Sequence, residues 1–151
     1  MNSLIFKNFF YCIIICCIIS SCKNEDDNNA NNPTTIQTNL QSGEWKITSF
    51  IDSDKNETAH FNGYTFTFEN SGILTAKNSN NTIEGNWSIT DNNSNDDSID
   101  DLHFNILFNV TNDFEDLNDD WDIISQSNSK IDLIDVSGGN GGTDYLTFEK
   151  N

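Results

Sequence analysis

The pattern of apolar and polar residues changes at Gly43, and from there it has the period of two that is typical of β-strands. Residues 43–52, GEWKITSFID, place Trp45, Ile47 and Ile51 on one face of such a strand. Residues 102–110 give the clearest alternation, with an apolar face made of Leu102, Phe104, Ile106, Phe108 and Val110.

The same pattern predicts eight strands, which are residues 44–52, 63–69, 72–77, 82–90, 102–110, 120–125, 130–136 and 143–149. Polar loops join them, and residues 112–118 predict one short helical turn with Phe114 and Leu117 inward. No strand–helix–strand spacing occurs, so we expect an antiparallel sheet with up-and-down connections. Eight such strands close into a small barrel, which makes the expected fold class all-β.

The first part of the chain does not follow this pattern. Residues 9–19 are a short apolar run, and a membrane-spanning helix needs about 20 apolar residues. The run fits a signal peptide over residues 1–21 instead. Residues 22–41 are rich in Asn, Asp, Thr and Gln and lack apolar periodicity, so they predict a flexible tether. Residues 42–151 remain for the barrel domain.

The end of the apolar run, Ile19-Ser20-Ser21-Cys22, resembles the lipobox of bacterial lipoproteins. In that family the signal is cut before the cysteine, which carries a diacylglycerol and is usually acylated. The resemblance therefore implies lipidation of Cys22 and attachment to a membrane, since two or more acyl chains hold a protein firmly there. The alternatives are an uncleaved apolar anchor, or cleavage at an ordinary site that leaves Cys22 as a free thiol.

The other three cysteines, Cys12, Cys16 and Cys17, lie in the segment that cleavage would remove, so we expect no disulfide in the mature domain. Lys23 and the acidic residues 25–27 resemble a signal that directs lipoproteins of some Gram-negative bacteria to the outer face of the outer membrane. This resemblance implies a surface-exposed protein. The alternative is that these residues are part of a solvated tether and are not an export signal.

The barrel region resembles the lipocalin-like domains of bacterial lipoproteins over residues 42–150. The likeness rests on the segments SGEWKITSF, with Gly43 and Trp45 as the lipocalin Gly-x-Trp, GYTFTFENSGILTA, IEGNWSI and GGTDYLTFEK. It implies a barrel whose interior holds side chains or one small ligand. The arginine that often packs on the tryptophan in lipocalins is missing here, because the chain contains no arginine.

The charge of the chain limits its partners. It carries 24 acidic and 7 basic residues, a formal net charge of −17, and all of the basic residues are lysines. A phosphate backbone needs a basic surface, so nucleic acid is excluded as an expected partner. An anionic membrane surface would repel the domain as well, which leaves the lipid on Cys22 as the expected contact with the membrane. We expect a monomer, since high net charge keeps proteins apart.

Polar clusters offer little chemistry. The acidic segments 91–101 and 113–122 are predicted to be solvated, with calcium as the alternative; an EF-hand frame from Asp91 fails at Asp96 and Leu102. The glycine-rich residues 137–142 lack the Lys-Ser/Thr of a phosphate loop and predict a hairpin. His60 and His103 alone make neither a zinc site nor a catalytic triad. We therefore expect no metal, no cofactor and no enzymatic activity.

The aromatic residues are the candidate binding site. They would line a pocket for a small apolar ligand, or else form an ordinary core. The leading hypothesis is a non-catalytic module that binds such a ligand. The alternative is an interaction protein with a filled barrel that contacts protein or carbohydrate at the cell surface. The candidate residues are Trp45, Tyr64, Phe66, Phe68, Trp87, Phe104 and Phe108, with Phe148 beside them.

Overall fold

The computed structural model describes residues 32–91, 102–137 and 142–151. The strands are β1 (Trp45–Asp52), β2 (Lys55–Asn56), β3 (Thr65–Phe68), β4 (Ile73–Lys77), β5 (Thr82–Asp91), β6 (Leu102–Leu107), β7 (Asp119–Gln126), β8 (Lys130–Val136) and β9 (Thr143–Lys150). The helical elements are α1 (Pro33–Gln41) and the 3₁₀ turns η1 (Thr58–Phe61) and η3 (Glu115–Leu117).

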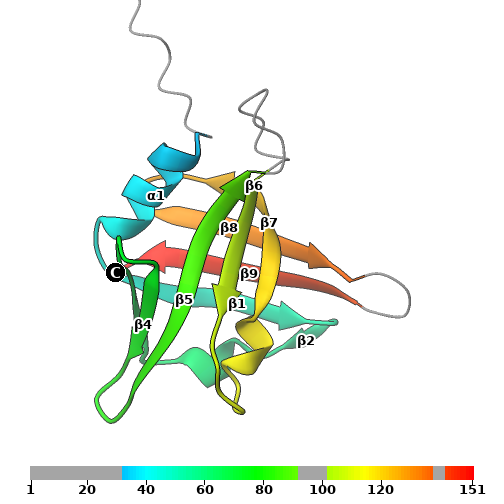
Figure 1. The fold of residues 1–151 in the computed structure, drawn as a ribbon. Helices are drawn as coiled ribbons and strands as arrows, with labels where there is room; N and C mark the ends of the chain where they lie inside the picture. The colour runs from blue at the N-terminus through cyan, green and yellow to red at the C-terminus, as the bar shows by residue number, and fades with distance from the viewer. Residues whose placement is uncertain (1–31, 92–101, 138–141) are drawn as a thin grey trace, which may run out of the picture.

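The strands form a closed antiparallel barrel (Figure 1). Apart from the short β2, each strand pairs with the next along the chain, and β1 pairs with β9 to complete the ring. The predicted fold class, an eight-stranded up-and-down barrel with one short helical turn at residues 112–118, is confirmed. All eight predicted strands exist, because regular alternation over five or more residues is a strong signal for a half-buried strand. Among the described residues, no helix is long and apolar enough to cross a membrane.

The signal peptide 1–21, the lipidation site Cys22, most of the acidic segment 91–101 and the glycines at 138–141 lie outside the described residues. The predictions made for them stay predictions.

The predicted inward face of β1 is correct only for its first half. Trp45 and Ile47 are buried, but after them Phe50 points inward and Ile51 is only half-buried. The reason is a β-bulge: Ile47 pairs with Phe148, and the next paired residue on β1 is Ser49, opposite Thr147. One extra residue on one strand reverses the alternation beyond it.

Residues 33–41 correct the predicted tether, because they form helix α1. The Asn32 side chain accepts a hydrogen bond from the backbone N–H of Thr34 (2.8 Å), and Pro33 occupies the first turn, both of which favour a helix start. Ile36 and Leu40, four residues apart, share one face and are buried. Two apolar residues are too few to give a visible period, so only their packing on the barrel reveals the helix.

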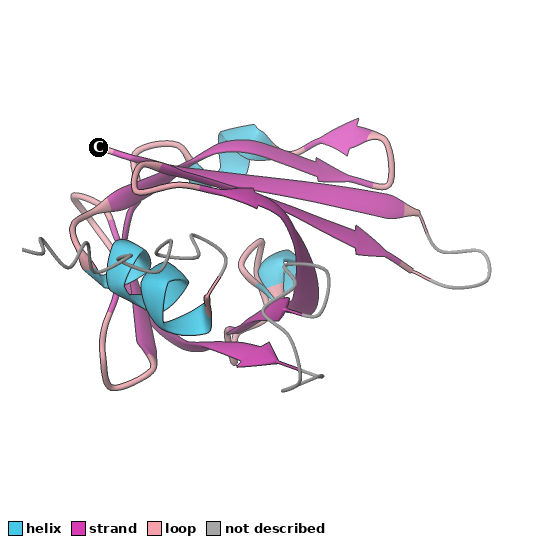
Figure 2. Cartoon of the chain, turned by 90° about the horizontal axis from the view of Figure 1, so that it is seen from above, coloured by secondary structure: helices cyan, strands magenta, loops and turns pink. Residues whose placement is uncertain are grey.

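Helix α1 covers one end of the barrel, here called the helix end, where β1 begins and β9 finishes (Figure 2). The indole Nε1 of Trp45 donates a hydrogen bond to the carbonyl of Leu40 (2.8 Å). The amide of Asn39 donates one to Gln126 (3.4 Å), at the end of β7. The helix is therefore part of the domain, which begins before residue 42.

The opposite end, here called the far end, is covered by the 3₁₀ turns η1 and η3. Strand β6 stops at Leu107, short of the predicted residue 110, because the side chain of Asn118 takes both backbone bonds of Phe108. Its amide donates to the Phe108 carbonyl at 2.9 Å, and its oxygen accepts from the Phe108 N–H. The chain then turns into η3, which buries Phe114 and Leu117 as predicted.

Candidate functional site

The candidate aromatic residues lie inside the barrel. Six of the seven are buried, with at most 6% of their surface exposed, and Tyr64 is half-buried. They belong to a single apolar cluster that also contains Ile36, Leu40 and residues from all eight barrel strands. The cluster also includes four aromatic residues that the sequence analysis did not name as candidate binding residues, namely Phe50, Phe61, Phe114 and Trp121. The burial of Phe50 and Phe61 was not predicted. The β-bulge in β1 turns Phe50 inward, and the 3₁₀ turn η1 buries Phe61.

Phe68 of β3 is the centre of the ring packing. Its ring centroid lies 5.3 Å from that of Trp87 and 5.6 Å from that of Phe104. The ring of Phe148 is 5.5 Å away and that of Trp45 is 6.4 Å away. These four rings come from β5, β6, β9 and β1, and three of them meet Phe68 at steep angles between 76° and 80°. Edge-to-face contacts of this kind are favourable beyond the burial itself.

A second group of rings fills the far end around Phe114, which precedes η3. Its ring centroid lies 5.3 Å from that of Phe61 and 5.0 Å from that of Tyr64. Phe108 is 5.1 Å away, and Phe66 is 6.1 Å away. Phe66 also contacts Phe148 at 5.3 Å, which joins this group to the rings around Phe68. The aromatic residues thus form one continuous stack of contacts from the middle of the barrel to the far end.

At the helix end, Trp45 has a cation on its ring although the chain has no arginine. The ammonium group of Lys150, in β9, lies 5.1 Å from the centre of the indole, which is a cation–π distance. The same ammonium group donates to the hydroxyl of Ser42 at 2.9 Å. Lys150 therefore packs on the Trp45 ring, where lipocalins often have an arginine.

Two hollows lie on the outer surface of the described part of the barrel. A groove of about 460 Å³ follows β5 and β6, lined by exposed side chains such as Asn86, Ser88 and Leu107. A second hollow of about 400 Å³ lies on the outer face of β3 and β4 and includes Thr65, Thr67 and Lys77. Trp87 is the one candidate aromatic residue that lines the first groove, together with Ile106 and Leu107, and none of the candidates lines the second hollow.

Both histidines lie beside carboxylates on the surface of the barrel. Nδ1 of His103 is 3.0 Å from a carboxylate oxygen of Asp122, on the outer face where the sequence places it. His60 on η1 has Glu57 and Asp113 within 3.9 Å. In the part of the chain that the structure describes, no group of three or more His, Cys, Asp or Glu side chains is arranged to hold a metal ion.

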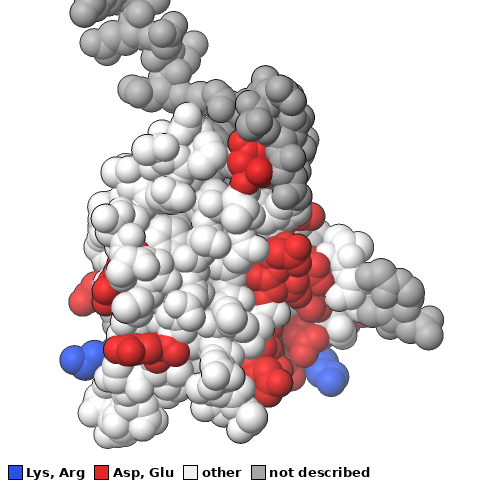
Figure 3. Space-filling view, viewed as in Figure 1, with Lys and Arg blue, Asp and Glu red and all other residues white. Residues whose placement is uncertain are grey.

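Acidic side chains gather beside the far end of the barrel, around η3 and the start of β7 (Figure 3). Burial raises the pKa of Asp116, and the nearby carboxylates of Glu57 and Asp52 raise it further. Burial also raises the pKa of Asp119, with a further contribution from Asp135. Like charges that lie this close destabilise the folded state, so these residues carry a cost in stability.

We expect Asp116→Asn to stabilise the protein at pH 7, by less than about 1 kcal/mol because the residue is on the surface. A carboxyl whose pKa is raised on folding stabilises the folded state only when protonated, and that contribution is lost as the pH rises through the folded pKa. The advantage of the variant should therefore shrink as the pH falls towards 3.8 and disappear below it.

Urea unfolding at pH 7 and at pH 3, followed by tryptophan fluorescence, measures the difference. Asp54→Asn is the matched control, since Asp54 is exposed in a turn with a positive φ of 72° that asparagine also tolerates. An equal gain for Asp116→Asn at both pH values would contradict the electrostatic explanation.

Comparison with known proteins adds a likeness in shape. The sequence matches no protein-family model, and no curated protein matches it. The crystal structure of a DUF4847 family protein from Bacteroides vulgatus ATCC 8482 aligns with a TM-score of 0.44 and 19% sequence identity. The alignment covers 74% of this chain and 94% of that one. A likeness at this level does not define a family for this chain.

Proposed function

We propose that this protein is a lipid-anchored, non-catalytic interaction module of the cell envelope, with a lipocalin-like barrel that is filled by its own side chains. One observation carries the proposal: Phe68, at the centre of the barrel, is in contact with rings from four other strands. In a barrel that holds a ligand, side chains line a space that the ligand fills. Here the candidate lining residues pack on one another, which supports the filled-barrel alternative.

The two ends of the barrel support the same proposal. Ile36 and Leu40 of α1 are buried at the helix end, and Phe61 and Phe114 are buried at the far end. A small apolar ligand would have to displace one of these groups and then separate rings that are already in contact. Each displaced side chain would lose about 1.5–3 kcal/mol of burial, which a small ligand would have to recover.

The place where the chain enters the domain fits an anchor at Cys22. Helix α1 starts at Pro33, at the helix end. Asn32 is ten positions after Cys22, so a fully extended chain places the barrel no more than about 35 Å from the lipid. The helix end would then face the membrane, and the far end and the sides of the barrel would be available to partners. We further propose that the module lies on the outer face of the outer membrane.

Titration with a neutral apolar dye, such as N-phenyl-1-naphthylamine, tests the filled barrel. A neutral dye is required because the net charge of −17 repels anionic probes. We expect no saturable binding to the parent protein. Phe68→Ala is the control for an opened interior and is titrated with benzene, since an apolar cavity of about one ring's size binds benzene but is too small for the dye. Saturable one-to-one binding to the parent, with quenching of tryptophan fluorescence, would favour the ligand-binding module instead.

Cys22→Ala tests the anchor. The lipid is the only expected attachment, so we expect the variant to leave the membrane fraction of a Gram-negative host, while the parent stays there with an added acyl mass in the mass spectrum. A variant with Cys12, Cys16 and Cys17 changed to serine is the matched control and should behave as the parent. If the parent carries no acyl mass on Cys22, the lipid anchor is wrong.

A further inference from the structure

An apolar row crosses the outer face of the barrel. Ile51 of β1 is directly opposite Tyr145 of β9, and Tyr145 is directly opposite Ile134 of β8. Each of the three alternates along its strand with a buried neighbour, so its side chain points away from the interior. The register therefore places three large apolar side chains side by side on three adjacent strands.

Two more residues extend this row, and one of them is there because of a β-bulge. Val136, two residues after Ile134, is on the same face of β8 and is 64% exposed. On β7 the pairing passes from Ile123 directly to Ser125, which leaves Ile124 as the extra residue. Ile124 is 52% exposed and lies opposite the step from Leu133 to Asp132 on β8, while Asp122 is the β7 residue directly opposite Ile134. The outer apolar row is thus defined as Ile51, Ile124, Ile134, Val136 and Tyr145.

The grouping of these side chains is the informative feature. Single exposed apolar residues are common on protein surfaces, whereas a contiguous group marks an interaction site. Four large apolar residues are exposed in the described part of the chain, and three of them, Ile124, Val136 and Tyr145, belong to the outer apolar row. The fourth, Leu107, is 55% exposed on β6, outside the row.

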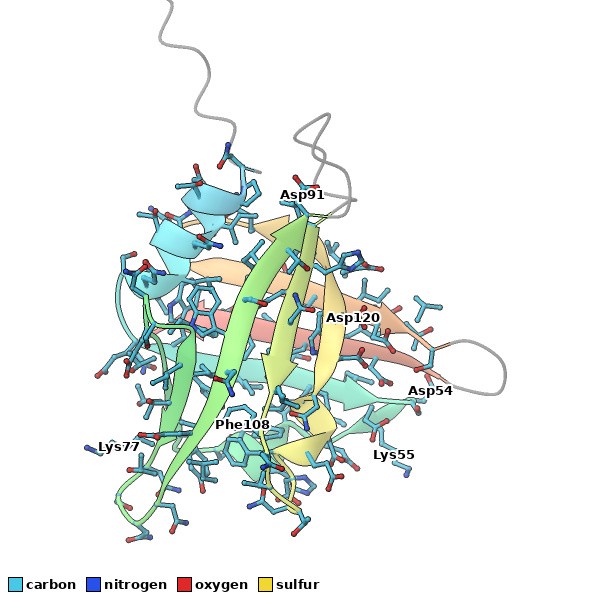
Figure 4. All side chains as sticks on the ribbon, viewed as in Figure 1. Asp54, Lys55, Lys77, Asp91, Phe108 and Asp120 are labelled. Atoms are coloured by element: carbon cyan, nitrogen blue, oxygen red, sulfur yellow. The ribbon has the colours of Figure 1, made fainter. Side chains whose placement is uncertain are left out.

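The charges beside the row are mainly negative. Asp120 and Asp122 alternate with the buried Trp121 on β7 and therefore lie on its outer face. Figure 4 labels Asp120 on this strand. Two lysines lie near the row. Lys130 is paired with Asp132 at 2.9 Å, and Lys55 on β2 is opposite Asp52, the residue after Ile51.

Asp132 itself is satisfied within the protein. Burial alone would raise its pKa, but hydrogen bonds from Lys130, Ser125 and Thr147 outweigh burial and lower the pKa. Asp120 and Asp122 are the other two carboxylates at this edge. Asp122 already has Nδ1 of His103 at 3.0 Å, so the carboxylate of Asp120 is the main charge that a partner would meet there.

We propose that the outer apolar row binds a protein segment with an apolar stripe flanked by lysine or arginine. This inference rests on the proposed interaction function and names the chemistry of its partner. Charge complementarity selects the occupant, because cations on the partner would face Asp120 and Asp122. A second copy of this chain would bring the same carboxylates and a net charge of −17 against them.

The dimensions of the row fit an amphipathic helix. Its residues lie on four adjacent strands, β1, β9, β8 and β7, so at a spacing of about 4.8 Å the row is roughly 15 Å long. A helix of about ten residues has the same length. The probe is therefore a synthetic 14-residue helix with leucines along one face and lysines on the other, and the control probe has glutamate in place of lysine.

Binding of the two peptides is measured by fluorescence anisotropy with the mature chain, made soluble by Cys22→Ala. We expect the lysine peptide to bind in a salt-dependent manner and the glutamate peptide not to bind. The charge-neutral variant Ile124→Ser/Val136→Ser/Tyr145→Ser should bind the lysine peptide at least about tenfold more weakly, as expected when apolar anchors are removed from an interface. Asp120→Asn/Asp122→Asn should weaken binding and reduce its dependence on salt.

Leu107→Ser is the matched control, since it removes an equally exposed apolar residue outside the row, and it should bind as the parent does. Circular dichroism verifies that each variant is folded. Equal binding of the lysine peptide by the parent and the triple variant would overturn the inference. So would a dimer of the parent in sedimentation experiments that the triple variant abolishes, because a second copy would then cover the row. The dye titration does not depend on either outcome. The experiments can therefore show separately whether the proposed binding surface is wrong and whether the proposed filled barrel is wrong.

Discussion

Replacing Phe68 by alanine is expected to lower the free energy of unfolding by about 3–5 kcal/mol, the range for removing a phenylalanine from a packed core. The side chain is buried and in contact with Trp45, Trp87, Phe104 and Phe148, which belong to four different strands. The barrel backbone closes on itself, so it has little freedom to collapse into the space that the ring leaves. The cost should therefore lie towards the upper end of the range.

Urea unfolding of the parent and Phe68→Ala, followed by the fluorescence of the three tryptophans, measures this cost. Leu107→Ala is the matched control, because Leu107 is apolar but more than half exposed, and it should change stability by less than about 0.5 kcal/mol. A cost below about 1 kcal/mol for Phe68→Ala would mean that the interior is not tightly packed, and the filled barrel would lose its main support.

The second large effect is expected at α1. Ile36→Ser/Leu40→Ser should lower the free energy of unfolding by roughly 3–5 kcal/mol, since each residue contributes about 1.5–3 kcal/mol by its burial. The helix would also be lost from the barrel end, which removes the carbonyl of Leu40 as the partner of the Trp45 indole. A shift of the tryptophan emission towards longer wavelength should accompany the change in stability.

Thr34→Ser/Thr38→Ser is the matched control, with two substitutions on the exposed face of the same helix. It should leave both stability and emission close to those of the parent. Should the double serine variant at Ile36 and Leu40 unfold at the same urea concentration as the control, residues 33–41 would act as a tether after all.

The strands were predictable because each repeats one local signal several times. In β6, three apolar residues alternate with His103, Asn105 and Leu107, and the pattern alone gives the buried face. The six buried aromatic candidates were predictable for the same reason. Their contacts with one another were not, because Phe68 and Phe148 meet only when the barrel closes.

The remaining features depend on contacts between distant parts of the chain. The bulge at residues 47–49 turns Phe50 inward, and no local property of the sequence marks it. Helix α1 buries only Ile36 and Leu40, too few for a period to be visible. The outer apolar row has no sequence signature either, because Ile51, Tyr145 and Ile134 become neighbours only through the strand register.

The pairing of β1 with β9 has a consequence for how the protein is made. Trp45 pairs with Lys150, so the contacts that close the ring join the first barrel strand to the last residues of the chain. Contacts between such distant segments form slowly, because the entropy cost of closing a long loop comes before the contacts can stabilise the fold. The nascent polypeptide cannot close the barrel until β9 has been synthesised and is free to pair with β1, so the ring is the last part of the sheet to form.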